Sequence, residues 1–109
     1  LMMILSEIIS QLAEEIIEIP NEASLAIDLD DITCDSRKAS KNICFIAIKG
    51  SKSDGNIFID DAIKNGARVI FSDQLSGIRN VTAILKVKDT HVLLKKLTLI
   101  FYPKQPEQV

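Results

Sequence analysis

The chain has few of the residues on which metal centres and disulfide frameworks depend. Its 109 residues include no tryptophan, one histidine (His91) and two cysteines (Cys34 and Cys44). A structural zinc site usually needs four cysteine or histidine ligands at short spacings, and two cysteines do not make a disulfide framework. We therefore expect no metal site, and we expect Cys44 to be a small buried apolar side chain.

Long apolar runs and an excess of one charge are also missing. No window approaches the roughly 18 apolar residues of a membrane span, and the first residues lack the basic segment and cleavage site of a signal peptide. The formal net charge is −2, and the basic residues stand singly or in pairs, which gives no indication of a nucleic-acid partner. The sequence thus predicts a cytoplasmic protein that binds neither nucleic acid nor a membrane.

Sequence motifs for catalysis are absent as well. The chain contains no GxxxxGK[ST] phosphate loop, no GxGxxG after a strand, no GxSxG elbow and no HExxH. Nothing near His91 is placed to orient it as a general base, which favours a surface or helix-capping role. We therefore expect a domain that binds a ligand and cannot carry out group transfer alone.

What the chain does have is enough apolar residues for one core. Apolar residues make up 47% and charged residues 26%, which is ordinary for one globular domain of this length. The mean hydropathy of +0.19 is somewhat high for a free-standing soluble domain. This value indicates that some apolar surface meets another domain.

Helical periodicity is clearest at the two ends of the chain. Apolar side chains recur at helical spacing over residues 2–18, and Pro20 should end that helix. A last helix, capped by Asp89 or Thr90, carries an apolar stripe from Leu93 to Phe101. Two amphipathic helices are therefore expected to flank the middle of the chain.

The middle of the chain predicts a βαβ unit. The run from Ile43 to Ile48 is apolar throughout, as expected of a strand buried on both faces. A short helix over residues 58–65, ended by Gly66, and a second buried strand over residues 67–72 follow it. Such a unit makes its two strands parallel. The sequence predicts a small single α/β domain with a mixed, mostly parallel sheet of four to five strands and flanking helices.

Further strand signals lie on either side of this unit. Residues 81–87 alternate well enough for a strand, and residues 73–80 before them are expected to be a loop. Around Asp28, Asp30 and Asp31 the alternation slips by one residue, so we expect a bulge or tight turn there. Three clustered carboxylates could bind a divalent cation, but no further oxygen ligand is placed nearby, which favours a solvated strand edge.

Two loops dense in hydrogen-bonding groups flank the apolar run. The first is DSR, from Asp35 to Arg37, and the second is GSKSDG, from Gly50 to Gly55. One rigid strand between them would fix their mutual position. Ser36 offers a hydroxyl and Arg37 a planar fork that matches phosphate oxygens. The alternative is an ordinary turn in which Arg37 pairs with an acidic neighbour.

The second loop would contribute mainly its backbone. Small residues let the N–H groups of Ser51, Lys52 and Ser53 approach a ligand closely, and a concave set of N–H groups favours anions. Lys52 adds a mobile positive charge. Aspartates in such loops fix them by accepting local backbone N–H bonds. The residues expected to support the loops are Asp35, Asn42, Gly50, Asp54 and Gly55.

These pieces, in this order, resemble the N-terminal domain of the Mur ligases. After DSR come seven residues to Phe45 in ICFIAIKG, then SKSDG and IFIDDAIKNGARVIFSD. The family pattern is DSR, a glycine-containing turn, LFVAL-G, DGH, F-I, A-I and GA. The resemblance is close from Ile32 to Asp73 and looser over the last helix. The ending TLIFYPKQPEQV is similar to the segment that precedes the family's TGTNGKT ATP loop, in a form more typical of MurE than of MurF.

The resemblance implies a part in a larger enzyme. MurE ligases add diaminopimelate or lysine to UDP-N-acetylmuramoyl-L-alanyl-D-glutamate in peptidoglycan synthesis, with ATP and Mg²⁺ in a central domain. Residues 1–102 would be the UDP-binding N-terminal domain and residues 103–109 the start of the linker to that central domain. This fragment alone would hold no cofactor and be inactive. An N-terminal domain of MurF, or a stand-alone nucleotide-binding or interaction module, is the alternative.

The resemblance also implies contact residues. By position, the family's UDP contacts fall on Cys34, Ser36, Ser51, Lys52 and Ser53. The hydroxyl of Ser36 would face the diphosphate, and the backbone of Ser51 to Ser53 would face the uridine. Asn42 stands where a glycine is usual, so we expect a positive φ there, which asparagine tolerates. Asn56 replaces the histidine that usually follows DG.

Overall fold

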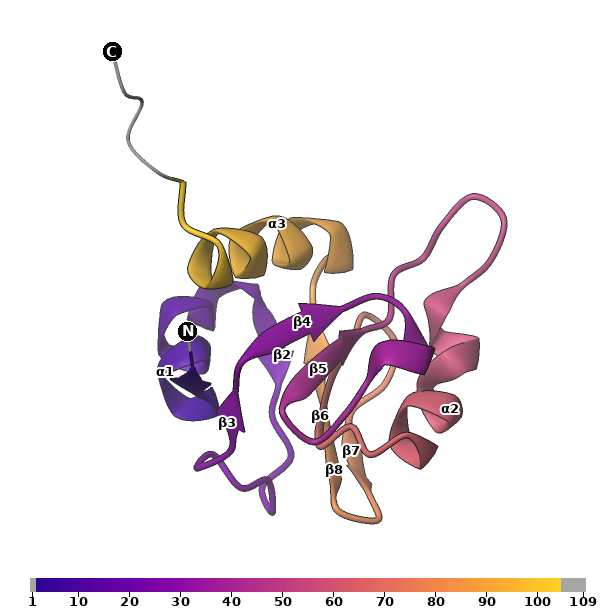
Figure 1. The fold of residues 1–109 in the computed structure, drawn as a ribbon, viewed down its shortest axis with the longest axis horizontal. Coiled ribbons are helices and arrows are strands. Elements are labelled where there is room, and N and C mark those ends of the chain that lie inside the picture. The colour runs from indigo at the N-terminus through magenta and orange to yellow at the C-terminus, as the bar shows by residue number, and fades with distance from the viewer. Residues whose placement is uncertain (1, 105–109) are drawn as a thin grey trace.

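The structure, a computed structural model, describes residues 2–104 and is built on one mixed β-sheet (Figure 1). The sheet has six strands in the order β2-β8-β6-β5-β4, with β7 also paired to β8. Their bounds are β2 Ile16–Glu18, β4 Asp31–Thr33, β5 Ile43–Ile46, β6 Val69–Ser72, β7 Gly77–Arg79 and β8 Thr82–Val87. Strands β4, β5, β6 and β8 are parallel, whereas β2 and β7 run antiparallel to β8. This confirms the predicted fold class, a mixed and mostly parallel sheet with flanking helices, although the sheet has six strands where four to five were predicted.

The predicted βαβ unit is present in the middle of the chain. A 3₁₀ turn, η3 (Gly55–Phe58), leads from the second loop into helix α2 (Ile59–Lys64). Gly66 follows the helix with a φ of 101°, and its N–H donates to the carbonyl of Ile63 at 2.9 Å. A glycine in this conformation ends a helix at little steric cost. The chain then enters β6, which pairs in parallel with β5.

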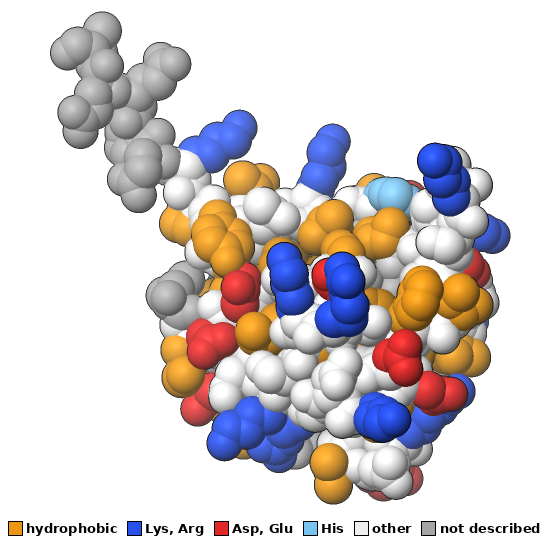
Figure 2. Space-filling model, turned by 45° about the vertical axis from the view of Figure 1, so that its right-hand side comes forward, with side chains coloured by type: hydrophobic (Ala, Val, Ile, Leu, Met, Phe, Trp, Pro, Cys, Tyr) orange, Lys and Arg blue, Asp and Glu red, His pale blue; other side chains and the backbone are white. Residues whose placement is uncertain are grey.

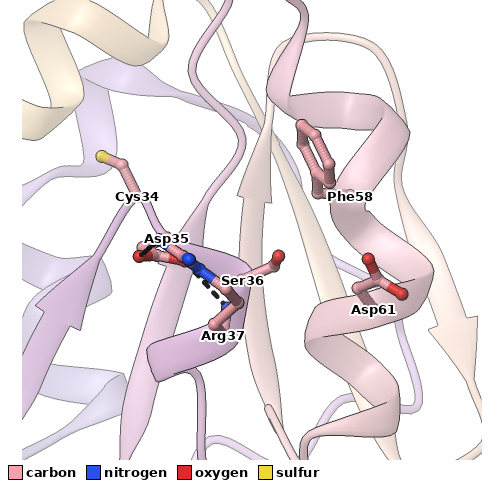
Figure 3. Close-up of a pocket in the computed structure, with 6 residues that line it drawn as sticks. All are labelled: Cys34, Asp35, Ser36, Arg37, Phe58 and Asp61. Atoms are coloured by element: carbon pink, nitrogen blue, oxygen red, sulfur yellow. Dashed lines mark hydrogen bonds and ion pairs between the residues drawn. The ribbon is translucent and has the colours of Figure 1, made fainter.

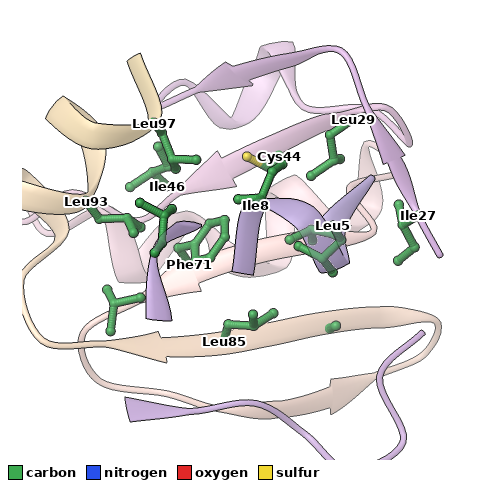
Figure 4. Close-up of a cluster of buried hydrophobic side chains, with 14 of the residues drawn as sticks. Leu5, Ile8, Ile27, Leu29, Cys44, Ile46, Phe71, Leu85, Leu93 and Leu97 are labelled. Atoms are coloured by element: carbon green, nitrogen blue, oxygen red, sulfur yellow. The ribbon is translucent and has the colours of Figure 1, made fainter. Parts of the chain in front are cut away.

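Helices cover both faces of the sheet. Helix α1 (Leu5–Gln11) and helix α3 (Thr90–Phe101) pack on one face and α2 on the other (Figure 1). Figure 4 shows the larger cluster, in which Cys44, Phe71 and Leu85 of the strands meet the helices on the α1 and α3 side. Full burial of an apolar side chain of this size contributes about 1.5–3 kcal/mol. Alternate residues of β5, β6 and β8 thus belong to two separate apolar clusters, one on each face of the sheet.

The buried position predicted for Cys44 is confirmed. Its side chain is fully buried in this cluster, and burial raises the pKa of its thiol to about 12. The cap predicted for the last helix is confirmed as well, because the carboxylate of Asp89 accepts the N–H groups of His91 and Val92. Among the described residues no helix has the length and hydrophobicity needed to cross a membrane.

The prediction of one helix over residues 2–18 is wrong at both of its ends. Residues Met3–Ile4 form a short strand, β1, which pairs with β3 (Asp28–Leu29), and α1 stops at Gln11. A 3₁₀ turn, η1 (Ala13–Glu15), and strand β2 take up the rest. The side chain of Ile16 fits a helical stripe, but it is β-branched and pairs with Val87 of β8 instead. Tertiary pairing overrides the local pattern here.

The loop predicted over residues 73–80 contains a strand. Strand β7 forms a hairpin with β8, and Asn80 turns between them with a φ of 54°. Asn80 is the one non-glycine residue with positive φ between residues 2 and 104, so the positive φ expected at Asn42 is wrong. Asn42 is held differently: its side-chain amide donates to the carbonyl of Asp28 at 3.0 Å.

An irregularity lies at Asp30 as expected, but it is neither the bulge nor the tight turn that the sequence predicted. Strand β3 pairs with β1 and strand β4 with β5, so the chain passes from the small sheet to the large one at Asp30. The N–H of Asp30 donates to the carbonyl of Asn42 at 2.8 Å, which fixes the start of β5 against this crossing. The end of the predicted linker, residues 105–109 with Pro106, lies outside the described residues.

Replacement of Gly55 should destabilise the fold and displace the second loop. A Cβ at this position would lie 2.7 Å from the backbone N and O of Ile48, and backbone atoms cannot move aside cheaply. We expect Gly55→Ala to lower the free energy of unfolding by about 1–3 kcal/mol in urea titrations. Gly50→Ala is the matched control, because its Cβ would meet a single atom at 3.2 Å. Equal losses in the two variants would contradict this packing argument.

Candidate functional site

A hollow of about 420 Å³ lies between the first loop and the start of α2 (Figure 3). Its lining comes from two parts of the chain that are distant in sequence. The residues that line it are Cys34, Asp35, Ser36, Arg37, Phe58 and Asp61. The first four come from the predicted DSR loop and its flank, and the last two from η3 and α2. Residues of the first loop are therefore brought together at one cavity.

Local hydrogen bonds give the first loop a fixed shape. It forms one 3₁₀ turn, η2 (Ser36–Lys38), in which the carboxylate of Asp35 accepts the N–H of Arg37 at 3.0 Å. The hydroxyl of Thr33 accepts the N–H of Asp35 at 3.0 Å. At the far side, the side-chain amide of Asn65, just after α2, donates to the carbonyl of Ser36 at 2.9 Å. Both β4 and α2 thus anchor the turn that carries Ser36.

The hydroxyl of Ser36 points into the hollow. The residue is 8% exposed, and Figure 3 shows its oxygen directed across the hollow toward α2. No other described residue forms a hydrogen bond with this hydroxyl. A hydroxyl can donate one hydrogen bond and accept others, so Ser36 can bind either an anionic oxygen or a hydroxyl group of a ligand.

Arg37 is paired with an acidic neighbour, the alternative that the sequence left open. Its Nε and Nη2 donate to the two oxygens of Asp35 at 3.0 and 2.9 Å. The guanidinium beside Asp35 lowers the pKa of that carboxyl to about 2, and the carboxylate in turn raises the pKa of Arg37. The Arg37 side chain is 87% exposed. Its remaining N–H donors are therefore accessible to a ligand, although its charge is largely offset.

Cys34 lies at the rim of the hollow. The residue is exposed, unlike Cys44, and partial desolvation raises the pKa of its thiol. A thiol with a raised pKa is largely neutral near pH 7, so Cys34 is a weak nucleophile there. It can contact a ligand as a small, uncharged group.

The second loop is closed at its base and exposed at its tip. Lys49 and Asp54 form a β-bridge, and the N–H of Gly50 donates to the carbonyl of Ser53 at 2.8 Å. The predicted contacts Ser51, Lys52 and Ser53 are all exposed. They do not line the hollow beside Ser36. The predicted contacts of the first loop therefore line one cavity, whereas those of the second loop lie on a separate projection.

Both loops nevertheless leave the same edge of the sheet. Strands β4 and β5 are parallel neighbours, so their carboxyl ends, which carry the two loops, lie side by side. In Figure 1 the second loop projects from this edge next to the start of α3. A ring nitrogen of His91 lies 2.9 Å from the carbonyl of Lys49, which ties the loop to α3.

Asn56 is a structural residue that the sequence did not identify. Its side-chain amide donates to Asp54 at 2.8 Å and to Asp73 at 3.2 Å, and its oxygen accepts the hydroxyl of Ser72 at 2.5 Å. These bonds join the end of the second loop to the end of β6. The sequence signal that could have identified Asn56 is that it stands where the family pattern usually has a histidine, directly after DG.

Phe58 and Asp61 were also missed as lining residues. The sequence pattern assigns them only to the helix over residues 58–65. Their spacing of three residues places them on the same side of a helical segment, where both can face one neighbour. This spacing would identify them as lining residues only together with the knowledge that the first loop lies next to this helix.

The acidic cluster and the basic residues show no concentration of charge. Asp31 accepts the N–H of Ile32 at 2.8 Å and the hydroxyl of Tyr102. Within residues 2–104 no group of three or more cysteine, histidine or acidic side chains is arranged to hold a metal ion. On the face shown in Figure 2, lysine and arginine side chains are dispersed among apolar and acidic ones.

The pairing of Asp35 with Arg37 should be visible in an acid titration. The pKa of Asp35 is about 2 in the folded chain, below its ordinary 3.8, so the pair contributes above about pH 4 and is lost as the pH falls toward 2. We expect Arg37→Gln to return the pKa of Asp35 toward 3.8, measured by the ¹³C shift of its carboxyl carbon. Arg79→Gln, which removes the partner of Asp60, is the control. An unchanged pKa in Arg37→Gln would contradict the assignment.

Comparison with known proteins relates the residues of this site to a protein family. A family model described as "Mur ligase family, catalytic domain" matches residues 28–102, a range that includes both loops and all six lining residues. A curated relative from Caldanaerobacter subterraneus, named UDP-N-acetylmuramoyl-L-alanyl-D-glutamate–2,6-diaminopimelate ligase, is 40% identical over 77 residues, which is 70% of this chain and 16% of that protein. A relative of the same name from Alkaliphilus metalliredigens is 37% identical over 99 residues, or 90% of this chain and 20% of that protein. The chain thus spans about a fifth of their length or less.

Solved structures show the same fold. UDP-N-acetylmuramoylalanyl-D-glutamyl-2,6-diaminopimelate–D-alanyl-D-alanyl ligase from Acinetobacter baumannii matches with a TM-score of 0.68 at 24% identity, over 89% of this chain and 21% of that one. At this identity the match shows the fold alone. The family model covers most of the chain, from the acidic cluster to the last helix, and on that basis the chain belongs to the Mur ligase family.

Proposed function

We propose that this chain is the UDP-binding N-terminal domain of a MurE-type ligase of peptidoglycan synthesis. It would hold the UDP end of UDP-N-acetylmuramoyl-L-alanyl-D-glutamate in the cytoplasm. The names of the two relatives support this substrate and favour a MurE-type over a MurF-type enzyme. Residues 1–102 would form the binding domain, and residues 103–109 would start the linker to a central domain that binds ATP and Mg²⁺. Since the chain itself has no phosphate loop, it should be inactive alone.

The observation that carries the proposal is the position of Ser36. The residue is 8% exposed, its hydroxyl points into a hollow, and it lies at the carboxyl edge of a parallel part of the sheet. Ligands of open α/β sheets bind outside this edge. In the proposed complex the Ser36 hydroxyl donates to a diphosphate oxygen. The accessible N–H groups of Arg37 can add a second contact, and Cys34 lies beside them.

The second loop would hold the uridine. The backbone of Ser51, Lys52 and Ser53 is exposed on the projection next to α3, where it can donate to and accept from a pyrimidine edge. Gly50 and Asp54 hold the base of this projection through the bonds described above, and the N–H of Gly55 donates to the carbonyl of Ile48 at 2.7 Å. In this proposal UDP lies along the sheet edge and touches both loops.

In such an enzyme this domain works at a distance from the reaction. ATP, bound elsewhere, activates the substrate carboxylate. The residues of this chain bind and orient the UDP end, so that the distant carboxylate is held near the place of reaction. Binding energy from a remote part of a substrate can in this way lower the entropic cost of the reaction.

Removal of the Ser36 hydroxyl should weaken substrate binding. A hydrogen bond to a charged group is worth about 1.5–3 kcal/mol, so we expect Ser36→Ala to raise the Kd of the UDP-substrate by about ten- to a hundredfold. Titration calorimetry on the full-length ligase would measure this, and ATP affinity should stay nearly constant. Ser10→Ala, on the exposed side of α1, is the control. Unchanged substrate affinity in Ser36→Ala would contradict the role given to Ser36.

Bound UDP should protect Cys34 from alkylation. Cys34 is exposed beside Ser36, whereas Cys44 is buried and its thiol has a pKa of about 12, so Cys44 serves as an internal control. We expect iodoacetamide at about pH 8 to modify Cys34 alone, and saturating UDP to slow that reaction several-fold. Mass spectrometry follows both thiols. An equal rate with and without UDP would count against ligand binding at the first loop.

A further inference from the structure

The chemical make-up of the hollow indicates which part of the ligand enters it. We infer that the wall formed by Phe58 and Asp61 receives an uncharged sugar ring next to the diphosphate, and that the phosphates themselves stay outside this wall. The inference rests on the proposed function and assigns two residues that the resemblance did not.

The charges around the hollow disfavour phosphate against the wall formed by Phe58 and Asp61. Asp35 and Arg37 form a bidentate pair, so their charges largely cancel. The carboxylate of Asp61 forms no hydrogen bond or ion pair with any other described residue, and it therefore leaves the hollow with a net negative charge. A diphosphate placed against Asp61 would be repelled, since like charges at short range destabilise each other.

A carboxylate is instead suited to a ligand that donates. An ionised carboxylate accepts hydrogen bonds and donates none, so its natural partners are hydroxyl and N–H groups. Acidic residues bind the hydroxyls of ribose in this way in other α/β folds. Figure 3 shows the Asp61 carboxylate on the α2 side of the hollow, opposite the Ser36 hydroxyl.

Phe58 adds an apolar surface to the same wall. Phe58 is 38% exposed. It lines the hollow together with Asp61, which lies three residues later in the sequence. An exposed aromatic ring beside a free acceptor provides apolar contact for the C–H face of a sugar and a partner for its hydroxyls. The backbone at Phe58 is fixed by η3 and by the cap at Asp54.

The position of Ser36 makes the two assignments compatible. The proposed diphosphate contact is Ser36, and the wall lies across the hollow from it. In a UDP-linked muramoyl substrate a sugar is attached to each end of the diphosphate, ribose on one side and N-acetylmuramoyl on the other. Either sugar has hydroxyl groups from which the Asp61 carboxylate can accept hydrogen bonds.

Asp61→Asn tests this inference, with Asp60→Asn as the matched control. Asp60 is the adjacent residue in the first turn of the same helix, but it pairs with Arg79 at 2.8 Å and does not line the hollow. Binding to the 109-residue chain would be titrated with UDP, 2′-deoxy-UDP, UDP-N-acetylglucosamine and inorganic pyrophosphate. We expect Asp61→Asn to weaken binding of a UDP ligand about three- to tenfold and Asp60→Asn to leave it unchanged.

The probes identify which sugar is bound. A loss seen with UDP but not with its 2′-deoxy form supports ribose at the wall, and a loss confined to UDP-N-acetylglucosamine supports the amino sugar. Tighter binding of UDP and pyrophosphate to Asp61→Asn would mean that phosphate lies against Asp61, and it would overturn the inference. No change with any probe would overturn it as well.

Failure of the inference can be distinguished from failure of the proposed function. If the wild-type chain binds UDP and Ser36→Ala weakens that binding, while Asp61→Asn does not, only the sugar wall is wrong. If the wild-type chain binds none of the UDP ligands at millimolar concentration, the proposed function fails and the inference fails with it.

Discussion

The parallel pairing of β5 with β4 determines where the polar loops of this chain lie. Asp31, Ile32 and Thr33 are in register with Ile43, Cys44 and Phe45, so both strands reach their carboxyl ends at the same edge. Strand β5 is apolar on both faces. A slip by one residue would therefore still bury apolar side chains on each face, so burial alone does not set the register. The bonds of Asn42 to the 28–30 segment hold one end, and the bond from the N–H of Gly55 to the carbonyl of Ile48 holds the other. The hydrogen bonds at these two ends fix the register of β5, which its apolar side chains alone do not determine.

The same edge combines two kinds of binding surface. The first loop offers the hydroxyl of Ser36, unpaired among the described residues, beside the ion pair of Asp35 and Arg37, and the second offers exposed residues on a projection. A ligand that spans both must have a part that tolerates a carboxylate and a part that accepts backbone N–H groups. A nucleotide joined to a sugar has both parts. This combination supports the proposal of a long, chemically varied ligand rather than a free phosphate ion.

The sequence predicted those elements whose signals are local. The apolar run into β5, the glycine that ends α2 and the aspartate that caps α3 each depend on neighbouring residues, and each was predicted correctly. Ile16 fits both a helix and a strand, and its place in β2 depends on Val87, far along the chain. Phe58 and Asp61 enter the hollow because η2 packs against the start of α2, and no local pattern records that contact. The family resemblance supplied the predicted contact residues of both loops, but it did not show that only the first group lines a cavity.

The central claim is that one ligand engages both loops at the edge set by β4 and β5. A titration of the ¹⁵N-labelled chain with UDP tests this claim most directly, followed by the amide signals of residues 34–37 and 50–55. The account predicts that both sets of signals move together and yield one dissociation constant. Movement of one set alone, or two different constants for the two loops, would contradict it.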